Sequence, residues 1–338
     1  RAAMLGRMAL FPGRKAAMRP SLAALALAVA AATHASASCT TLTAGDALLV
    51  VDVQNDFLET RSASNRSATG PHDPAYPIPS SERTGPDGSM IRGGSLAVPG
   101  SAIVADRTEL WYEAFAAAPG AHIFASQDFH PAGHCSFCRN GTAAGNPQGY
   151  HPHGAVCFSG KDVPTDVMNA TNRCLDGESK LLWGEDKYVQ WPDHCVQGSF
   201  GSLFDPFLGI PKKTVVVQKG FEHHYDSYSA FGGVTVGDRT PLADAITAAG
   251  IRRLWVLGVA LDYCVQQSTL DALGANPGTG RSAPPTLESV VLIHSATAAV
   301  NVTAGEKSVQ DIIKAGGHVV TAAGVEEAVQ QFCNQPGL

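Results

Sequence analysis

Short apolar runs that alternate with helical stretches are the feature that most limits how this chain can fold. The apolar runs lie at 47–53, 121–126, 214–218, 253–258, 289–293 and 317–321. Helical stretches are expected near 100–117, 240–249, 262–274, 307–315 and 324–332. Strands that alternate with helices build a parallel sheet covered by helices on both faces. The sequence therefore predicts a three-layer α/β fold with a six-stranded parallel sheet.

Three of these runs end near a residue that suits acyl-transfer chemistry. Asp52 and Lys219 stand at two strand ends, and Cys264 follows a third run at the expected first turn of a helix. Sites in open α/β sheets form outside the carboxyl ends of strands, so the three residues can converge. A helix N-terminus lowers the pKa of a thiol and offers N–H groups to an oxyanion. Taken singly, each residue has an ordinary structural alternative. Asp52 could cap a helix, Lys219 could be a solvated residue at a strand end, and Cys264 could be a small buried hydrophobe.

A fourth strand end carries residue types that bind metals. Asp128 and His130 follow the run at 121–126, and His194 lies in the later segment Trp191-Pro192-Asp193-His194-Cys195. One carboxylate with two or three imidazoles suits a borderline divalent ion that keeps open positions for water or substrate. The two segments together are therefore a candidate metal site.

The motifs together resemble those of the nicotinamidases in the isochorismatase-like cysteine hydrolase superfamily. The matching stretches are VDVQNDF (51–57), GGSLAVPG (93–100), QDFHPAGHCSF (127–137), WPDHCVQGS (191–199), QKG…YSAF (218–231) and LGVALDYCV (257–265). They span most of residues 46–320, and WPDHC with DxHPxxH is specific to the metal-containing amidases. The resemblance implies a metal-dependent enzyme that hydrolyses nicotinamide to nicotinate and ammonia through a cysteine thioester.

The resemblance also implies a role for each matched residue. The catalytic triad would be Asp52, Lys219 and Cys264. The oxyanion hole would use the N–H groups of Ala260 and Cys264, across a cis peptide between Val259 and Ala260. One divalent ion, with zinc ahead of iron or manganese, would be held by Asp128, His130 and His194, with His134 ranked second. The substrate ring would lie among Phe57, Trp191 and Tyr228.

Other classes of function stay open at this point. Another cysteine amidohydrolase of the superfamily, acting on a ureido or carbamoyl compound, would keep the triad without needing the metal. A secreted binding protein on the same fold, or an enzyme that uses the ion hydrolytically, would not need Cys264 as a nucleophile. The net charge of −6 gives no indication of nucleic acid or an anionic membrane surface as a partner. A homodimer is a hypothesis.

The amino-terminal residues predict a targeting segment. Basic residues at 14–19 precede an apolar run at 22–32 and then Ala35-Ser36-Ala37, as in a cleavable secretory signal. The run is short for a membrane span, and an organelle transit peptide is the alternative. We expect residues 1–37 to be the signal peptide of a secreted protein. Residues 38–338 are then expected to form one domain, with insertions at about 59–92 and 135–185.

The eight cysteines fit an oxidising compartment. With Cys264 reserved as the nucleophile and Cys195 in WPDHC, the six that remain are Cys39, Cys135, Cys138, Cys157, Cys174 and Cys333. An even number allows three disulfides. The cytosolic alternative is a zinc site built from the insertion cysteines, because Cys135 and Cys138 have the spacing of metal ligands. Asn-X-Ser/Thr sequons, which agree with a secreted glycoprotein, are at Asn65, Asn140, Asn169 and Asn301.

Overall fold

The structure is a computed structural model of the chain. It describes residues 41–59, 61–62, 90–91, 94–137, 191–223, 225–276 and 279–335. The predicted signal peptide and most of both predicted insertions lie outside these residues, so these predictions stay untested. None of the helices in the described ranges combines the length and apolar character that crossing a membrane requires.

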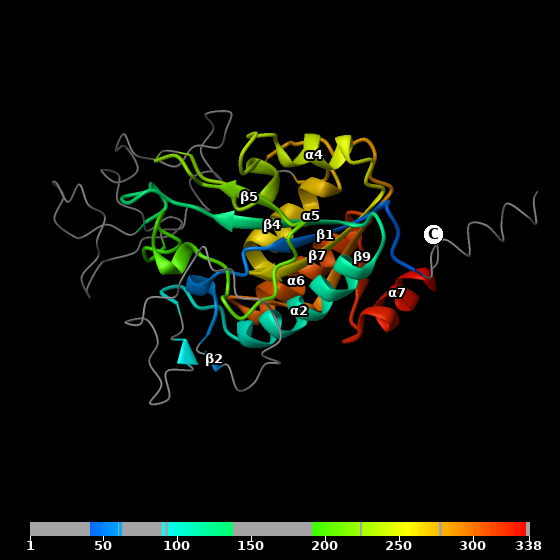
Figure 1. The fold of residues 1–338 in the computed structure, drawn as a ribbon, viewed down its shortest axis with the longest axis horizontal. Coiled ribbons are helices and arrows are strands. Elements are labelled where there is room, and N and C mark those ends of the chain that lie inside the picture. The colour runs from blue at the N-terminus through cyan, green and yellow to red at the C-terminus, as the bar shows by residue number, and fades with distance from the viewer. Residues whose placement is uncertain are drawn as a thin grey trace, which may run out of the picture. The chain divides into compact units, whose positions relative to one another are not determined.

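A seven-stranded sheet runs through the centre of the fold (Figure 1). Its strands are β1 (Asp46–Val51), β4 (His122–Asp128), β5 (Val215–Lys219), β6 (Val234–Thr235), β7 (Arg253–Val259), β8 (Ser289–Ala298) and β9 (His318–Val320), in the spatial order β6-β5-β4-β1-β7-β8-β9. Six strands are parallel, which confirms the predicted sheet. The seventh, β6, is an antiparallel edge strand beside β5. Its two residues are too few to show any periodicity in the sequence.

The strand order creates a crevice beside β1. From β1 the chain builds β4 and β5 on one side, and then crosses over to build β7, β8 and β9 on the other. Adjacent strands whose connections leave in opposite directions open a crevice at their carboxyl ends, where ligands bind in such folds. Asp52 follows β1 and Cys264 follows β7, so both residues lie at this switch point.

A glycine lets β7 approach β1 closely at the switch point. Gly258 has a φ of 125°, which disfavours other residues. A Cβ atom on Gly258 would lie 2.0 Å from the carbonyl oxygen of Val51. Only glycine therefore fits there, one strand residue before the peptide bond between Val259 and Ala260, which is cis.

Helices cover both faces of the sheet, as predicted. They are α2 (Ser101–Ala117), α4 (Leu242–Ala248), α5 (Gln266–Ala272), α6 (Val302–Lys314) and α7 (Val325–Cys333), with shorter turns η1 (Asn55–Phe57), η6 (Phe200–Ser202), η7 (Ala230–Gly232) and η8 (Leu261–Val265). The helices α2 and α7 pack together on one face, where Trp111 and Phe332 contact Trp255 with ring centroids 5.5 and 5.4 Å away. A second apolar core, which includes Leu49, Val256 and Ile312, lies between the other face and α4, α5 and α6.

A buried acid, Asp46, holds the amino-terminal end of β1. This end of the strand lies opposite the crevice, which is at the carboxyl ends of the strands. Asp46 is 1% exposed and is paired with the guanidinium of Arg253, at 2.8 Å from one of its nitrogens. It also accepts hydrogen bonds from the indole Nε1 of Trp255 and the backbone N–H of Thr43, both at 2.8 Å. Because all of its partners are donors, burial of this charge is compensated.

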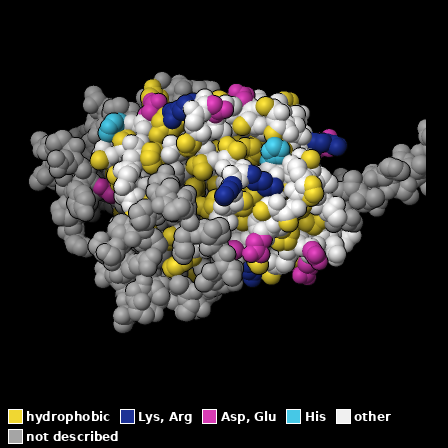
Figure 2. Space-filling model, in the orientation of Figure 1, with side chains coloured by type: hydrophobic (Ala, Val, Ile, Leu, Met, Phe, Trp, Pro, Cys, Tyr) yellow, Lys and Arg dark blue, Asp and Glu magenta, His cyan; other side chains and the backbone are white. Residues whose placement is uncertain are grey.

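The described parts of the insertions add two local features. The ends of the first insertion pair as short antiparallel strands, β2 (Arg61–Ser62) and β3 (Met90–Ile91). Among the described cysteines, Cys135 and Cys333 each take part in a disulfide, whereas Cys195 and Cys264 are free thiols. Figure 2 shows charged side chains of both signs in small separate groups over the described surface of one face.

Candidate active site

The three residues predicted as the triad meet at the carboxyl edge of the sheet. Lys219 Nζ lies 2.9 Å from Asp52 Oδ2 and 3.5 Å from Cys264 Sγ. A carboxylate oxygen of Asp52 lies within 4.8 Å of the same sulfur. The topology therefore brings together three side chains that are far apart in the chain. These residues are called the triad below.

Asp52 is fully buried in a strained backbone conformation. Its φ of 52° lies in the left-handed region, where few non-glycine residues occur. Its Oδ1 accepts a hydrogen bond of 2.6 Å from Ser126 Oγ on the neighbouring strand β4. Burial raises the pKa of Asp52 above its usual value, while Lys219 and Ser126 act in the opposite direction. A carboxylate with a raised pKa is suited to accept a proton near neutral pH.

Lys219 is a buried cation surrounded by acceptors. It pairs with the carboxylates of Asp52 and Asp128 and donates to the backbone carbonyl of Ser227 at 3.2 Å. Burial alone would lower the pKa of Lys219, but Asp128 and Asp52 raise it well above its usual value. The ammonium group therefore stays charged beside the sulfur.

The surroundings of Cys264 differ from the predicted start of a helix, at which the pKa of the thiol was expected to be lowered. The turn that carries it, η8, is π-helical and precedes the α-helix α5, and the side chain is 6% exposed. Burial raises the pKa of Cys264 well above its usual value, and the opposing effect of Lys219 does not offset it. The predicted lowering of this pKa at the start of a helix is therefore wrong for the resting site. The thiol is neutral there, and a base must take its proton during a reaction.

Ala260, predicted for the oxyanion hole, forms the corner between β7 and η8. The cis peptide bond that precedes it agrees with the one that the resemblance implies. Its carbonyl accepts hydrogen bonds from the N–H groups of Tyr263 (3.0 Å) and Val265 (3.1 Å), which fix the turn around the sulfur. Ala260 and Cys264 both line the same pocket.

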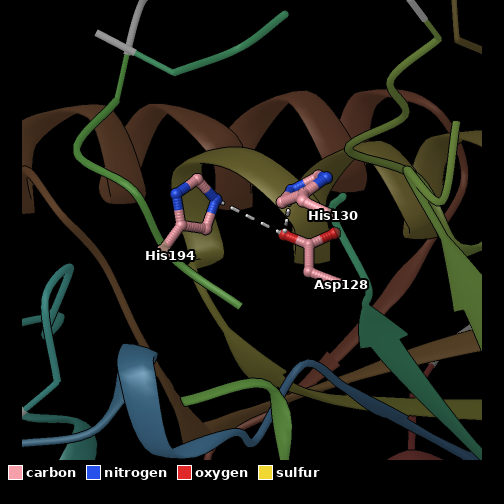
Figure 3. A group of neighbouring side chains, drawn as sticks. All are labelled: Asp128, His130 and His194. Carbon is pink, nitrogen blue, oxygen red and sulfur yellow. Dashed lines mark ion pairs between the residues drawn. The ribbon is translucent and has the colours of Figure 1, made fainter. Parts of the chain in front are cut away.

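The predicted metal ligands also meet, beside the triad. The Nε2 atoms of His130 and His194 lie 3.5 and 3.8 Å from Asp128 Oδ2 (Figure 3). The Nδ1 atoms are bound to the backbone carbonyls of Gly220 and Pro192, at 2.8 and 2.7 Å. These three residues are called the ligand group below.

The donor set of the ligand group fits a divalent metal ion. A carbonyl acceptor keeps the proton on Nδ1 and leaves the Nε2 lone pair free to bind a metal. One carboxylate and two such imidazoles are ordinary ligands of zinc and similar ions. Burial, followed by the effect of His130, lowers the pKa of His194 to about 4, so this imidazole is neutral. Asp128 raises the pKa of His130 against the effect of burial.

His134, ranked second from the sequence, lies outside the ligand group. Its Nε2 bonds to the carbonyl of Tyr225 at 3.0 Å and its Nδ1 to Ser136 Oγ at 2.7 Å. The ring stacks on His130 with a centroid distance of 4.1 Å. Burial, together with His130, lowers the pKa of His134 to about 3. In this arrangement His134 supports the ring of His130, and it groups with His130 and Asp226 as possible metal ligands, apart from the set that contains Asp128.

Cys264 of the triad and all three residues of the ligand group line one pocket. The space there, part of which is open to solvent, is about 430 Å³, and its lining is Phe57, Leu96, Val98, Asp128, His130, Trp191, His194, Asp226, Tyr228, Ala260, Tyr263, Cys264 and Val300. The three predicted aromatic residues are all in this lining. Trp191 Nε1 donates to the hydroxyl of Tyr228 at 2.9 Å, and the Phe57 ring centroid lies 5.4 Å from that of His194. The aromatic walls suit a small flat ring.

Several lining residues were missed from the sequence. Tyr263 packs edge-on against Trp191 with a centroid distance of 5.0 Å, and its position just before Cys264 was the available signal. Leu96 and Val98 belong to GGSLAVPG, a matched motif to which no role was given. Asp226 and Val300 lie in loops with no pattern that would indicate a pocket.

Comparison with known proteins is consistent with this geometry. The isochorismatase domain model matches residues 46–324, so the chain belongs to the isochorismatase family. A nicotinamidase of Escherichia coli is 31% identical over 230 residues, which cover 67% of this chain and 76% of that protein. A nicotinamidase of Acinetobacter baylyi is 31% identical over 125 residues, 37% of this chain, and the match spans only about half (54%) of that protein. The structure of a yeast nicotinamidase has the same fold, with a TM-score of 0.51 at 18% identity over 81% of this chain and 98% of the yeast chain.

Proposed function

We propose that the protein is a metal-dependent nicotinamidase, which hydrolyses nicotinamide to nicotinate and ammonia. The observation that carries the proposal is that Cys264 and the ligand group line the same pocket. A flat ring of nicotinamide size can contact the ligand group while its carboxamide lies over the sulfur. The similarity to nicotinamidases of bacteria and yeast supports this substrate.

Cys264 is the proposed nucleophile and Asp52 the proposed base. As the sulfur attacks the carboxamide carbon, its proton passes to the Asp52 carboxylate, which lies within 4.8 Å. Lys219, 3.5 Å from the sulfur, stabilises the negative charge that develops there. The proton then moves from Asp52 to the departing nitrogen, the C–N bond breaks and ammonia leaves. Water cleaves the remaining thioester, which releases nicotinate and restores the thiol.

The oxyanion formed in both steps needs donors close to Cys264. We assign the backbone N–H groups of Ala260 and Cys264 to this role, because both residues line the pocket around the sulfur. Removing one donor of this kind costs enzymes about 10²–10³-fold in kcat.

The ligand group would hold the metal, and the aromatic residues would hold the ring. An ion bound by Asp128, His130 and His194 would act as a Lewis acid toward the pyridine nitrogen and so orient the ring. Phe57, Trp191 and Tyr228 would restrict the ring to one plane, and holding it there lowers the entropic cost of attack. Zinc is the first candidate, with iron and manganese as alternatives.

Ammonia release from nicotinamide by the purified full chain tests the proposal. The expected result is turnover that a chelator removes and a divalent ion restores. Turnover that persists in the chelated enzyme would contradict metal dependence. Hydrolysis of a ureido or carbamoyl compound in place of nicotinamide would favour the other superfamily activity.

We also propose that the protein is secreted and glycosylated, and that it carries three disulfides. The disulfide-bonded state of Cys135 and Cys333 supports this proposal, as do the predicted signal and the sequons. Non-reducing peptide mapping should find three bridges among six cysteines and a free thiol at Cys264. Finding those six as free thiols would favour a cytosolic enzyme. Light scattering on the same sample would test the homodimer.

A further inference from the structure

We propose that Asp56 is a positioning residue for the ligand group, because its carboxylate fixes the peptide that joins His194 to Cys195. The inference rests on the proposed function, in which His130 and His194 bind the metal. Asp56 lies in η1, four residues after Asp52, and touches neither imidazole directly in the contacts that the structure describes. Its effect would pass through the backbone of Cys195.

The backbone of Cys195 connects the two histidine segments. Its N–H donates to Asp56 Oδ2 at 2.7 Å, and its carbonyl accepts from the N–H of His130 at 3.0 Å. The N–H of Gln197 then donates to the carbonyl of His130 at 2.8 Å, which continues the pairing of the segments. Holding Cys195 in place therefore sets the separation between His130 and His194.

The conformation of Cys195 requires such support. Its φ of 46° lies in the left-handed region, which is unfavourable for residues other than glycine. A strained residue keeps such a conformation only when its surroundings enforce it. The bond to Asp56 is short and involves a charged acceptor, and bonds of this type are about twice as strong as neutral ones.

A second contact holds the other side of His194. Ser95 Oγ donates to the carbonyl of Asp193 at 2.6 Å, and the N–H of Ser95 donates to Asp56 Oδ1 at 3.3 Å. Asp56 thus contacts the peptide after His194 directly and supports the residue that binds the peptide before it. His194 is held on both sides by a network that has Asp56 at its centre.

The close packing around Asp56 shows that its carboxylate has little room to move. A Cβ atom on Gly201 would lie 1.9 Å from Asp56 Oδ2, so only glycine allows the carboxylate to reach Cys195. The N–H of Leu96 also donates to the backbone carbonyl of Asp56 at 3.1 Å. The acid is therefore fixed on both its backbone and its side chain.

Zinc affinity of the full-length protein tests this role separately from activity. We would measure the dissociation constant for Zn²⁺ by competition with a chromophoric chelator, the visible spectrum of bound Co²⁺, and the thermal unfolding of the metal-free protein. The variants are Asp56→Ala, which removes the acceptor, and Asp56→Asn, which keeps an acceptor without the charge. Glu59→Gln is the matched control, since Glu59 accepts the N–H of Gly100 at 3.0 Å in the same region.

Asp56→Ala should weaken Zn²⁺ binding about 10- to 100-fold, as the loss of outer-shell partners does, and should alter the Co²⁺ spectrum. Asp56→Asn should have a smaller effect in the same direction, and it carries the test if Asp56→Ala does not fold. Glu59→Gln should bind Zn²⁺ like the wild type. A dissociation constant within twofold of wild type in both Asp56 variants, or an equal loss in Glu59→Gln, would overturn the inference. Failure of the wild type to bind Zn²⁺ would instead refute the proposed metal site, and this inference with it.

Discussion

The triad and the ligand group share one pocket, but different kinds of contact hold them. The triad side chains contact one another directly, and each lies at or just beyond the end of a parallel strand. In the ligand group only Asp128 belongs to a strand, and the two imidazoles are oriented by backbone carbonyls. The position of the triad therefore follows from the order of the strands, whereas that of the ligand group depends on loops.

Lys219 is the contact between the two groups. It pairs with Asp52 in the triad and with Asp128 in the ligand group. Its charge offsets part of the repulsion between two buried acids, so changes in one group reach the other through this residue. Substitutions elsewhere in each group should still separate their effects.

Cys264→Ala should produce the largest loss and should affect the triad alone. Without a nucleophile, kcat for nicotinamide should fall by at least about 10³-fold. Zinc content, measured by elemental analysis, should stay at the wild-type level because the sulfur is not in the ligand group. Residual turnover of several per cent would contradict a covalent route.

His194→Ala should instead affect the ligand group first. We expect Zn²⁺ affinity to fall at least about 100-fold, since changes to outer-shell partners alone cost 10–100-fold. KM should rise more than kcat falls, because the proposed task of the ion is to orient the ring. The measurements are metal titration and steady-state kinetics with added Zn²⁺. Equal metal occupancy in the variant and the wild type would show that His194 is not a ligand.

Ser126→Ala should weaken the base of the triad while leaving the metal in place. The hydroxyl donates to Asp52 Oδ1 at 2.6 Å and lowers the pKa of this acid. Without it the pKa of Asp52 should rise further, so a larger fraction is protonated at neutral pH and kcat/KM falls about tenfold. The acid limb of the pH profile should move to higher pH. A loss that is the same at every pH would argue against Asp52 as the base.

Tyr228→Phe should produce the smallest change in the kinetic constants. The change should be confined to the aromatic residues Trp191 and Tyr228, which line the pocket. It removes the acceptor of the Trp191 Nε1 hydrogen bond and keeps the ring. We expect KM to rise about two- to fivefold with kcat nearly unchanged, as for one neutral hydrogen bond. Adding Trp191→Phe to Tyr228→Phe should raise KM by a smaller factor than Trp191→Phe raises it in the wild type. The reason is that either substitution alone already removes the hydrogen bond that the two residues share.

The sequence predicted the parallel sheet and the convergence of the triad because both depend on periodicity and on strand ends. The apolar runs set the strands, and residues such as Asp52 and Lys219 stand where those strands stop. The edge strand β6 was missed because its register comes from pairing with Gln218 and not from its own two residues. Most other boundaries agree with the predicted ranges within two residues, but α6 begins at Val302, ahead of the predicted 307, and β8 continues to Ala298, past the predicted 293.

Other properties of the site depend on tertiary contacts that a sequence does not display. The high pKa of Cys264 results from burial, which the position of a residue in a turn does not determine. The orientation of His134 depends on Tyr225 and Ser136, each of which is hydrogen-bonded to one of its two ring nitrogens. The pocket residues Asp226 and Val300 come from loops whose course is fixed only by the folded chain. The ligand group was predicted from metal-binding residue types near one strand end, together with the family resemblance, and not from periodicity.

Contacts that stabilise the fold and a residue proposed for catalysis lie at opposite ends of the strand β1. The stabilising contacts are those of the buried Asp46 with Arg253 and Trp255. Asp46 and Asp52 lie at opposite ends of β1, about 20 Å apart for six residues of extended chain. Many enzymes gain thermal tolerance at the expense of turnover because the same residues serve both. Here, strengthening the contacts of Asp46 with Arg253 and Trp255 would stabilise the amino-terminal ends of β1 and β7, which lie at the opposite end of these strands from the pocket. These strand ends are therefore a suitable target for engineering a more heat-resistant protein with unaltered catalytic properties.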